Sequence, residues 1–245
     1  MATLPVERTT FEQLLEAYLQ QFADSGGGSG TILPARLSII NAVKAKIDEL
    51  IPEGEGVQFT LESVPNISNP FDIFINTILD EVAKELLLIA PLHVLVPTVP
   101  SPLPTGTQVL ADDWGKTGYV TLPEDFLRLQ AFQMTEWERP VHIPITPLDP
   151  LYAMQRNKYV RGGVAKPVAV LAFNGATKVL EYYSVQTAHT VSVFRYIPET
   201  LPEDIQDNLF DSLTWLVASK VLQIIGSQLS KPAYDQAILT FKDMQ

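Results

Sequence analysis

Cysteine is absent from the sequence of 245 residues. This absence excludes a disulfide framework, a thiolate zinc site, an iron–sulfur cluster and a cysteine nucleophile. The three histidines, His93, His142 and His189, are far apart, and none has a His, Asp or Glu nearby at metal-ligand spacing. We therefore expect no metal and no cofactor, and we expect that the chain is not an enzyme.

Basic side chains are also few, with 17 Lys and Arg against 28 Asp and Glu, which gives a formal net charge of −11. Sequence-neutral binding to duplex DNA needs clustered Lys and Arg, whereas the basic residues here are scattered. Long hydrophobic runs are lacking too, because Pro91 and His93 interrupt the most apolar stretch, residues 86–96. That stretch is half as long as a bilayer span requires, and the N-terminus lacks the pattern of a secretory signal. We expect no membrane contact.

The apolar content of 46% is sufficient for a packed core. Apolar residues at helical spacing predict helices over residues 10–22, 34–50 and 69–90, with a Gly-rich joint at 24–31 between the first two. Asn69 as N-cap and Pro70 at the first helical position mark the third helix. Five prolines between residues 91 and 104 predict an extended connector over 91–106.

From residue 107 to residue 198 the pattern changes to short strands separated by turn residues. Asn174-Gly175 predicts a hairpin turn, and we expect the strand at 190–197 to lie beside that hairpin. One short helix is predicted over 150–158. The strands are predicted over residues 118–122, 127–134, 140–145, 167–173, 178–183 and 190–197.

The C-terminal part returns to helical spacing, with a helix predicted from Pro202 to a cap at Gly226 and a last helix from residue 230. Apolar helix faces at the two ends of a chain can cover each other. We therefore expect an α+β fold, in which the N- and C-terminal helices (1–90 and 199–245) form one bundle. A small antiparallel β-sheet domain (107–198) is inserted between them.

Aromatic and arginine residues concentrate in the strand region. They fit a sheet core with arginines at its edge, but both residue types are also enriched at protein interfaces. The candidate subunit or partner interface consists of Trp114, Trp137, Arg139, Tyr152, Arg156, Tyr159 and Arg161. A less favoured hypothesis is a hydrolase with Asp112, Asp113 or His142 in a cleft between the lobes, because adjacent carboxylates such as these two point apart.

Five short motifs follow one another between residues 122 and 198. They are Leu122-Pro123-Glu124-Asp125-Phe126-Leu127-Arg128-Leu129, Pro147-Leu148-Asp149-Pro150-Leu151-Tyr152, Lys166-Pro167-Val168, Leu180-Glu181-Tyr182-Tyr183 and Tyr196-Ile197-Pro198. Their order resembles that of tailed-bacteriophage head-to-tail adaptor proteins, a family that includes the tail-tubular-A type of podoviruses. The crAss-like phages carry several such ring proteins. The resemblance spans about residues 122–226 and includes the apolar face of the C-terminal helix.

The resemblance implies a structural subunit of a ring, typically a dodecamer, that docks under the portal protein and extends the DNA channel to the tail. Its implied partners are further copies of the chain, the portal protein, neighbouring tail or ring proteins, and genomic DNA that passes without specific binding. The implied location is the head–tail junction of the virion, after assembly in the bacterial host cytoplasm. A lumen that DNA slides through should repel phosphate, and Glu203, Asp204 and Asp207 are the candidate lumen-facing residues. The alternative is another phage tail or baseplate component.

Overall fold

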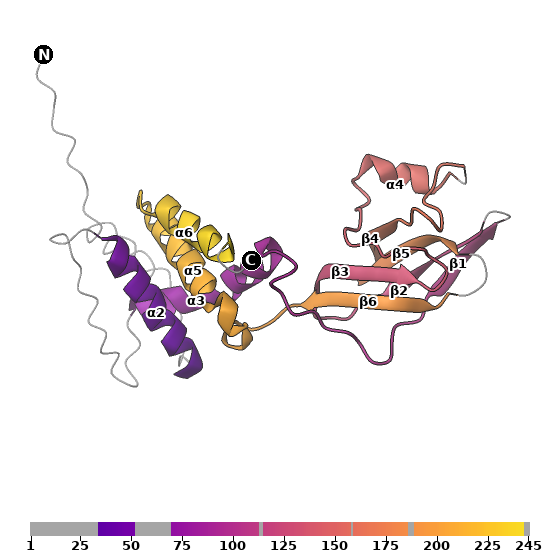
Figure 1. Ribbon diagram of the computed structural model, residues 1–245. Coiled ribbons are helices and arrows are strands. Elements are labelled where there is room, and N and C mark those ends of the chain that lie inside the picture. The colour runs from indigo at the N-terminus through magenta and orange to yellow at the C-terminus, as the bar shows by residue number, and fades with distance from the viewer. Residues whose placement is uncertain (1–33, 52–69, 113–114, 158, 186–188, 243–245) are drawn as a thin grey trace, which may run out of the picture. The chain divides into compact units, whose positions relative to one another are not determined.

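The computed structural model describes residues 34–51, 70–112, 115–157, 159–185 and 189–242 (Figure 1). The fold is α+β, and the chain divides into two compact units. The helical unit combines Met1–Val94 with Thr200–Gln245, and the β unit is Leu95–Glu199. The helix predicted over 10–22, the joint at 24–31 and the N-cap Asn69 lie outside the described residues. No described helix is both long enough and apolar enough to cross a membrane.

Helix α5 is the central element among the described helices of the helical unit. It contacts α2, α3 and α6, and eleven of its sixteen side chains are buried, as expected for a helix that is apolar on most sides. Gly226 ends α5 in the left-handed conformation (φ 84°), which confirms the predicted cap. The helices are α2 (Pro34–Leu50), α3 (Pro70–Ile89), α5 (Phe210–Ile225) and α6 (Ser230–Lys242).

The prediction that a helix begins at Pro202 is wrong. Two short 3-10 turns, η1 (Pro202–Asp204) and η2 (Asp207–Leu209), precede α5. Ile205 and Gln206 between them have extended backbone dihedrals, which interrupt the helical path. Tertiary contacts hold the turns in place, since Glu203 pairs with Arg36 and Asn208 donates to the carbonyl of Val94. These contacts with Arg36 and Val94 override the helical preference of the local sequence.

The β unit contains two antiparallel sheets (Figure 1). The larger sheet has the strand order β1-β2-β5-β4, and the smaller pairs β3 with β6. Gly175 lies at the β4–β5 turn with a φ of 65°, as the predicted hairpin requires. The elements are β1 (Thr107–Asp112), β2 (Gly115–Thr121), β3 (Phe126–Met134), α4 (Pro150–Gln155), β4 (Ala169–Asn174), β5 (Thr177–Val185) and β6 (Val191–Pro198).

Strand β1 was not predicted, because its sequence has little apolar alternation. Two predictions about the other strands are wrong. Residues 140–145 form only isolated bridges, since Pro140 and Pro144 have no N–H to donate to a ladder. Strand β6 does not join the hairpin but pairs with β3, where Phe194 and Tyr196 stack with Phe126.

The larger sheet has apolar contacts on both faces. On its inner face, Leu180 and Tyr182 join the core that includes Phe132 and Phe194 of the smaller sheet. On its outer face, Val179 and Tyr183 form a second cluster with Val170 and Ala172, against which Tyr119 and Tyr152 pack. Successive residues of a strand point to opposite faces, so Tyr182 and Tyr183 belong to different clusters.

The segments that enter and leave the β unit are hydrogen-bonded to each other. Thr98 and Tyr196 exchange two backbone hydrogen bonds, with N···O distances of 2.8 Å and 3.1 Å. The backbone N–H of Glu199 then donates to the carbonyl of Asp125 at 2.6 Å. Both ends of the β unit are thus fixed to strands that belong to its own core.

Candidate functional site

A cavity of about 470 Å³ lies at the outer face of the larger sheet, beside α4 and the loop that follows α4. Strands β1, β2 and β5 supply its floor, and the residues from 152 to 161 supply its other wall. Three tyrosines, two arginines and one glutamate give it an aromatic and polar lining. The tyrosine–arginine cavity is lined by Val109, Thr117, Gly118, Tyr119, Tyr152, Gln155, Arg156, Arg161, Glu181 and Tyr183.

Buried Gln155 closes the base of the loop that carries both arginines. Its amide group donates to the carbonyl of Leu151 at 3.0 Å and accepts from the backbone N–H of Gly162 at 2.8 Å. Asp149 caps the start of α4 by accepting from the N–H of Leu151 at 2.8 Å. Arg156 and Arg161 therefore stand at the two ends of a loop whose ends are tied together.

A second anchor joins this loop to β5. Ser184 has a φ of 61°, a conformation that is uncommon for a residue with a side chain, and its hydroxyl donates to the carbonyl of Gly162. It lies in a bulge, because three steps along β5, from Tyr182 to Val185, oppose two steps along β2. The bulge keeps Val185 in the inner core while the loop is held against the strand.

Four residues of the cavity form two pairs. Tyr183 donates its hydroxyl hydrogen to Glu181 at 2.7 Å, and desolvation, together with this carboxylate, raises the pKa of Tyr183. The guanidinium of Arg156 lies over the ring of Tyr152, 5.4 Å from the ring centroid. With one carboxylate and two arginines the lining has an excess of positive charge. The arrangement is suited to an anionic group that brings an apolar surface with it.

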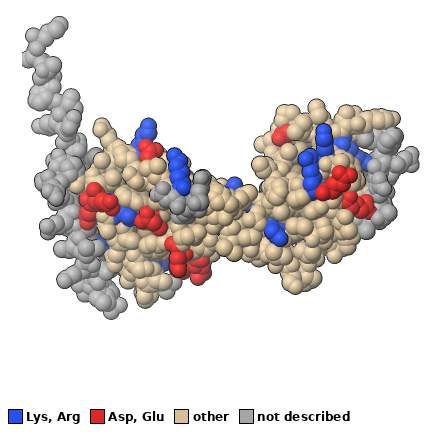
Figure 2. Space-filling view, viewed as in Figure 1, with Lys and Arg blue, Asp and Glu red and all other residues tan. Residues whose placement is uncertain are grey.

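Large apolar side chains are exposed around α4. The α4 ridge, which we define as Leu148, Leu151 and Met154, has its most exposed side chain at Leu148, at 94%. Tyr159 and Val160 in the following loop are exposed as well. Figure 2 shows that on the face in view charged side chains form small separate groups, with wide uncharged areas between them. An exposed apolar patch beside a polar cavity is typical of a protein interaction site.

The structure brings together some of the predicted interface residues and separates others. Tyr152, Arg156 and Arg161 line the cavity, and Tyr159 lies on the loop between the two arginines. Arg139 is exposed but does not line the cavity. Trp114 lies outside the described residues.

Trp137 is the exception, since only 3% of it is exposed and it cannot contact a partner from the surface. Its ring meets the ring of Phe132 edge-on at 5.5 Å within the inner core. Of the two interpretations of the aromatic residues, a sheet core or an interface, the sheet core is therefore correct for Trp137.

The sequence did not single out Tyr119, Glu181 and Tyr183 as part of the site. The signal that could have found them is the two-residue period of a strand, which places Glu181 and Tyr183 on one face of β5. Both hairpin tyrosines are buried, Tyr182 in the inner core and Tyr183 in the outer cluster. Tyr183 also lines the cavity.

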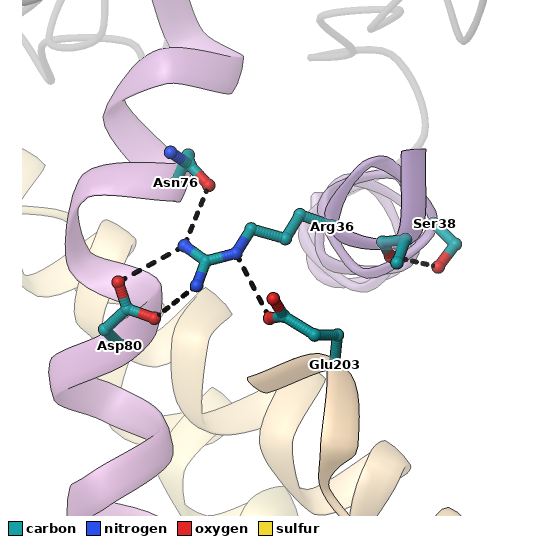
Figure 3. Close-up of polar contacts among 6 residues, drawn as sticks. Arg36, Ser38, Asn76, Asp80 and Glu203 are labelled. Carbon is teal, nitrogen blue, oxygen red and sulfur yellow. Dashed lines mark hydrogen bonds and ion pairs between the residues drawn. The ribbon is translucent and has the colours of Figure 1, made fainter. Parts of the chain in front are cut away.

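The three candidate acidic residues differ in their surroundings. Arg36 donates from Nε to Glu203 at 3.1 Å, and its two terminal nitrogens lie 2.7 Å and 3.2 Å from the carboxylate of Asp80 (Figure 3). The charge of Glu203 is therefore compensated within the helical unit. Asp204 and Asp207 are exposed, and no basic residue of the described part of the chain pairs with either.

Of the side chains considered for a hydrolase, the structure describes only that of His142. The Nδ1 atom of His142 lies 2.7 Å from the carbonyl oxygen of Gln130, and Asp113 is outside the described residues. The ring of His189 is held between the hydroxyl of Tyr182 and the side-chain oxygen of Gln108. Within the described ranges, no group of three His, Asp or Glu residues is placed to hold a metal ion.

No protein-family model matches this chain, and no curated protein matches it significantly.

Proposed function

We propose that the chain is a structural subunit of the head-to-tail connector ring of a tailed bacteriophage. In this role copies of the chain form a ring, in the family typically a dodecamer, that docks under the portal protein and extends the DNA channel toward the tail. Neighbouring tail or ring proteins would contact its other side, and genomic DNA would pass through the lumen without specific binding. The virion is its proposed location.

The observation that carries this proposal is the spatial meeting of motifs that are far apart in the sequence. Asp125 belongs to the first motif of the family-like order and Tyr196 to the last. The hydroxyl of Tyr196 donates to the carboxylate of Asp125, and the rings of Tyr196 and Phe126 stack at 5.7 Å between centroids. The first and last motifs thus contact each other within one core. Such contacts support the view that the motifs keep their order because they belong to a shared fold.

The second and fourth motifs also meet. Tyr152 of the second motif packs against the outer cluster that contains Tyr183 of the fourth, and both line the tyrosine–arginine cavity. The third motif lies next to them, since Val168 packs against the same cluster. The five motifs are thus distributed over the two clusters of the β unit, which accounts for their order without a catalytic role.

Charge is divided unequally between the two units. The helical unit carries 8 of the 17 basic and 19 of the 28 acidic residues, a formal charge of −11, whereas the β unit carries 9 of each and is formally neutral. An acidic surface repels the phosphates of DNA, and repetition of that surface around a ring would strengthen the effect. This division supports the helical unit as the part that faces DNA.

The proposal includes a finer description of the fold. The helices before Val94 and after Thr200 belong to one compact unit, and α5 contacts α2, α3 and α6. We take these helices to form one bundle, with the β unit inserted into it. An inserted unit is free to carry contacts to neighbouring proteins while the bundle keeps its own core.

Quantitative mass spectrometry of purified virus particles tests the proposal. We expect this chain and the portal protein at equal copy number, with host proteins trapped in the preparation as the background level. Absence of the chain from intact particles would contradict the proposal. A copy number clearly different from that of the portal protein would favour the alternative, a tail or baseplate component elsewhere in the particle.

A further inference from the structure

We propose that the tyrosine–arginine cavity and α4 ridge of one copy bind the acidic turn of a second copy, where the acidic turn is residues 201–210 of the helical unit. The inference rests on the proposed ring, because it names the surfaces through which neighbouring subunits would meet. It needs only the chain itself as a partner, and it uses surfaces that the structure describes on both sides.

The binding side combines positive charge with exposed apolar area. Arg156 is exposed, and Gln155 holds it and Arg161 at the two ends of one closed loop. Tyr183 donates to Glu181, and Arg156 and Arg161 contribute two guanidinium groups to the lining, with attachment points fixed by the closed loop. The α4 ridge adds apolar surface directly beside them. A complementary partner must bring carboxylates and apolar side chains together.

The acidic turn of the helical unit supplies such a partner. Most of its described carboxylates are paired inside the unit. Those pairs are Asp80 and Glu203 with Arg36, Asp72 with Lys44, Glu49 and Asp211 with Lys46, and Glu85 with Lys220. Asp204 and Asp207 have no basic partner among the described residues and lie close together in sequence. Their uncompensated charge is available to an external cation.

Apolar side chains flank these two carboxylates. Leu201 is 53% exposed at the start of the acidic turn, and Phe210 is 39% exposed at its end. An exposed leucine and phenylalanine on either side of two aspartates match the composition of the opposite surface, where apolar residues surround two arginines. Charge complementarity fixes the register of such a contact, and the apolar area supplies most of its affinity.

The two surfaces are different parts of the same chain, so the contact is heterologous. Each copy offers one binding surface and one acidic turn, and repetition of the contact yields either a closed ring or an open helical filament. The formally neutral β unit of one copy would meet the acidic helical unit of the next, which lessens the repulsion between copies that each carry a charge of −11. The contact therefore fits a ring subunit.

The absence of native cysteine allows a direct test by site-specific cross-linking. Leu151→Cys on the α4 ridge and Leu201→Cys on the acidic turn leave both arginines and both aspartates in place. The two full-length variants, one carrying a mass tag, are mixed and treated with a short bismaleimide. Leu239→Cys is the matched control for the acidic turn, because it is also an exposed leucine of the helical unit, at 45% against 53%.

We expect the 151–201 mixture to give on the order of tenfold more mixed dimer than the 151–239 mixture, as an affinity gain of about 1.4 kcal/mol implies. Arg156→Glu with Arg161→Glu in the first variant should abolish this preference, and so should Asp204→Lys with Asp207→Lys in the second. Both charge reversals together should restore it. The charge-matched controls Arg139→Glu and Asp235→Lys, at exposed positions outside the two surfaces, should leave the preference unchanged.

The outcomes separate this inference from the proposed function. Equal yields of mixed dimer for the 151–201 and 151–239 mixtures would overturn the contact, whatever the copy number in particles. The connector proposal would then be tested by mass spectrometry alone. Preferential linking that the charge reversals do not change would also overturn it, since the arginines and aspartates would then have no part in the contact. Preferential linking in a chain that is absent from particles would support the contact and contradict the connector.

Discussion

The hydroxyl of Tyr196 lies 3.0 Å from one carboxylate oxygen of Asp125 and 3.2 Å from the other, and it donates its hydrogen to this carboxylate. The pair joins the start of β3 to the end of β6. The backbone of Tyr196 is bonded to Thr98 on the entering segment at the same point. One tyrosine thus connects both ends of the β unit to its core.

Tyr196→Phe should lower the free energy of unfolding by about 1.5–3 kcal/mol, because the hydrogen bond that it removes is to a charged group. Urea denaturation followed by circular dichroism measures the change. Asp125→Ala and the double variant complete a thermodynamic cycle. Effects that simply add would contradict a direct interaction between the two side chains.

Alkaline pH should destabilise the β unit. Burial and the neighbouring Asp125 raise the pKa of Tyr196 to about 12, and burial also raises the pKa values of Tyr182 and Tyr183. A raised pKa means that the fold favours the neutral phenol, so this stability is complete below the unfolded value of about 10 and is lost as the pH rises from there toward 12.

Absorbance at 295 nm, recorded against pH, should show these tyrosines ionising later than the exposed ones and together with the loss of circular dichroism. The variant Tyr159→Phe is the control, because Tyr159 is 73% exposed and its loss should leave the late phase unchanged. A single transition near pH 10 for all tyrosines would contradict the prediction.

The buried ion pair between Lys44 of α2 and Asp72 of α3 should be costly to break, since both side chains are only 2% exposed. Lys44→Met leaves the carboxylate of Asp72 without a counter-charge, and we expect a loss of about 3–5 kcal/mol in the free energy of unfolding. Replacing both residues by apolar ones should restore most of the stability, because no buried charge remains.

Lys220→Met is the matched control for this pair. The Lys220–Glu85 pair is partly exposed with an N···O distance of 3.7 Å, so its loss should cost about 0–1 kcal/mol. Equal effects of Lys44→Met and Lys220→Met in urea denaturation would show that burial of the Lys44–Asp72 pair has no energetic consequence.

Two adjacent glycines should respond differently to a methyl group. A Cβ at Gly162 would lie 2.7 Å from a methyl carbon of Val168 and 2.9 Å from the backbone nitrogen of Val168, whereas a Cβ at Gly163 meets nothing within 4 Å. We expect Gly162→Ala to cost about 1–3 kcal/mol through overpacking. Gly163→Ala should be near neutral or slightly stabilising. Thermal unfolding measures both variants.

Gly162→Ala should also disturb the tyrosine–arginine cavity, because Gly162 bonds both Gln155 and Ser184. The mixed-dimer yield of the cross-linking experiment is the readout, with Gly163→Ala as the reference. Unchanged linking in a folded Gly162→Ala protein would show that the loop does not need its anchor to place Arg156 and Arg161.

The features predicted correctly from the sequence are those that neighbouring residues determine. The spacing of apolar residues predicted α2 with the bounds observed, Pro70 opens α3, and Gly175 and Gly226 have the positive φ angles expected of them. Each of these features depends on residues within one or two turns of each other, so the sequence contains the necessary information.

The features that were missed depend on partners far along the chain. Nothing within β6 indicates that it pairs with β3, about sixty residues earlier, rather than with the nearby hairpin. Tyr182 and Tyr183 are equally aromatic, and only the sheet register and the bulge at Ser184 determine which of them faces the cavity. The site was therefore predicted for α4 and its loop but not for the strands that form its floor.

The hydrogen bonds between Thr98 and Tyr196 bring the two boundaries of the β unit together on a single pair of neighbouring backbone segments. A unit closed in this way can be inherited as a cassette. Two recombination points, one before Thr98 and one after Glu199, would transfer the cavity, the α4 ridge and both sheets at once into another helical host. Lineages could thereby exchange the unit that carries the cavity while the acidic helical unit evolves separately.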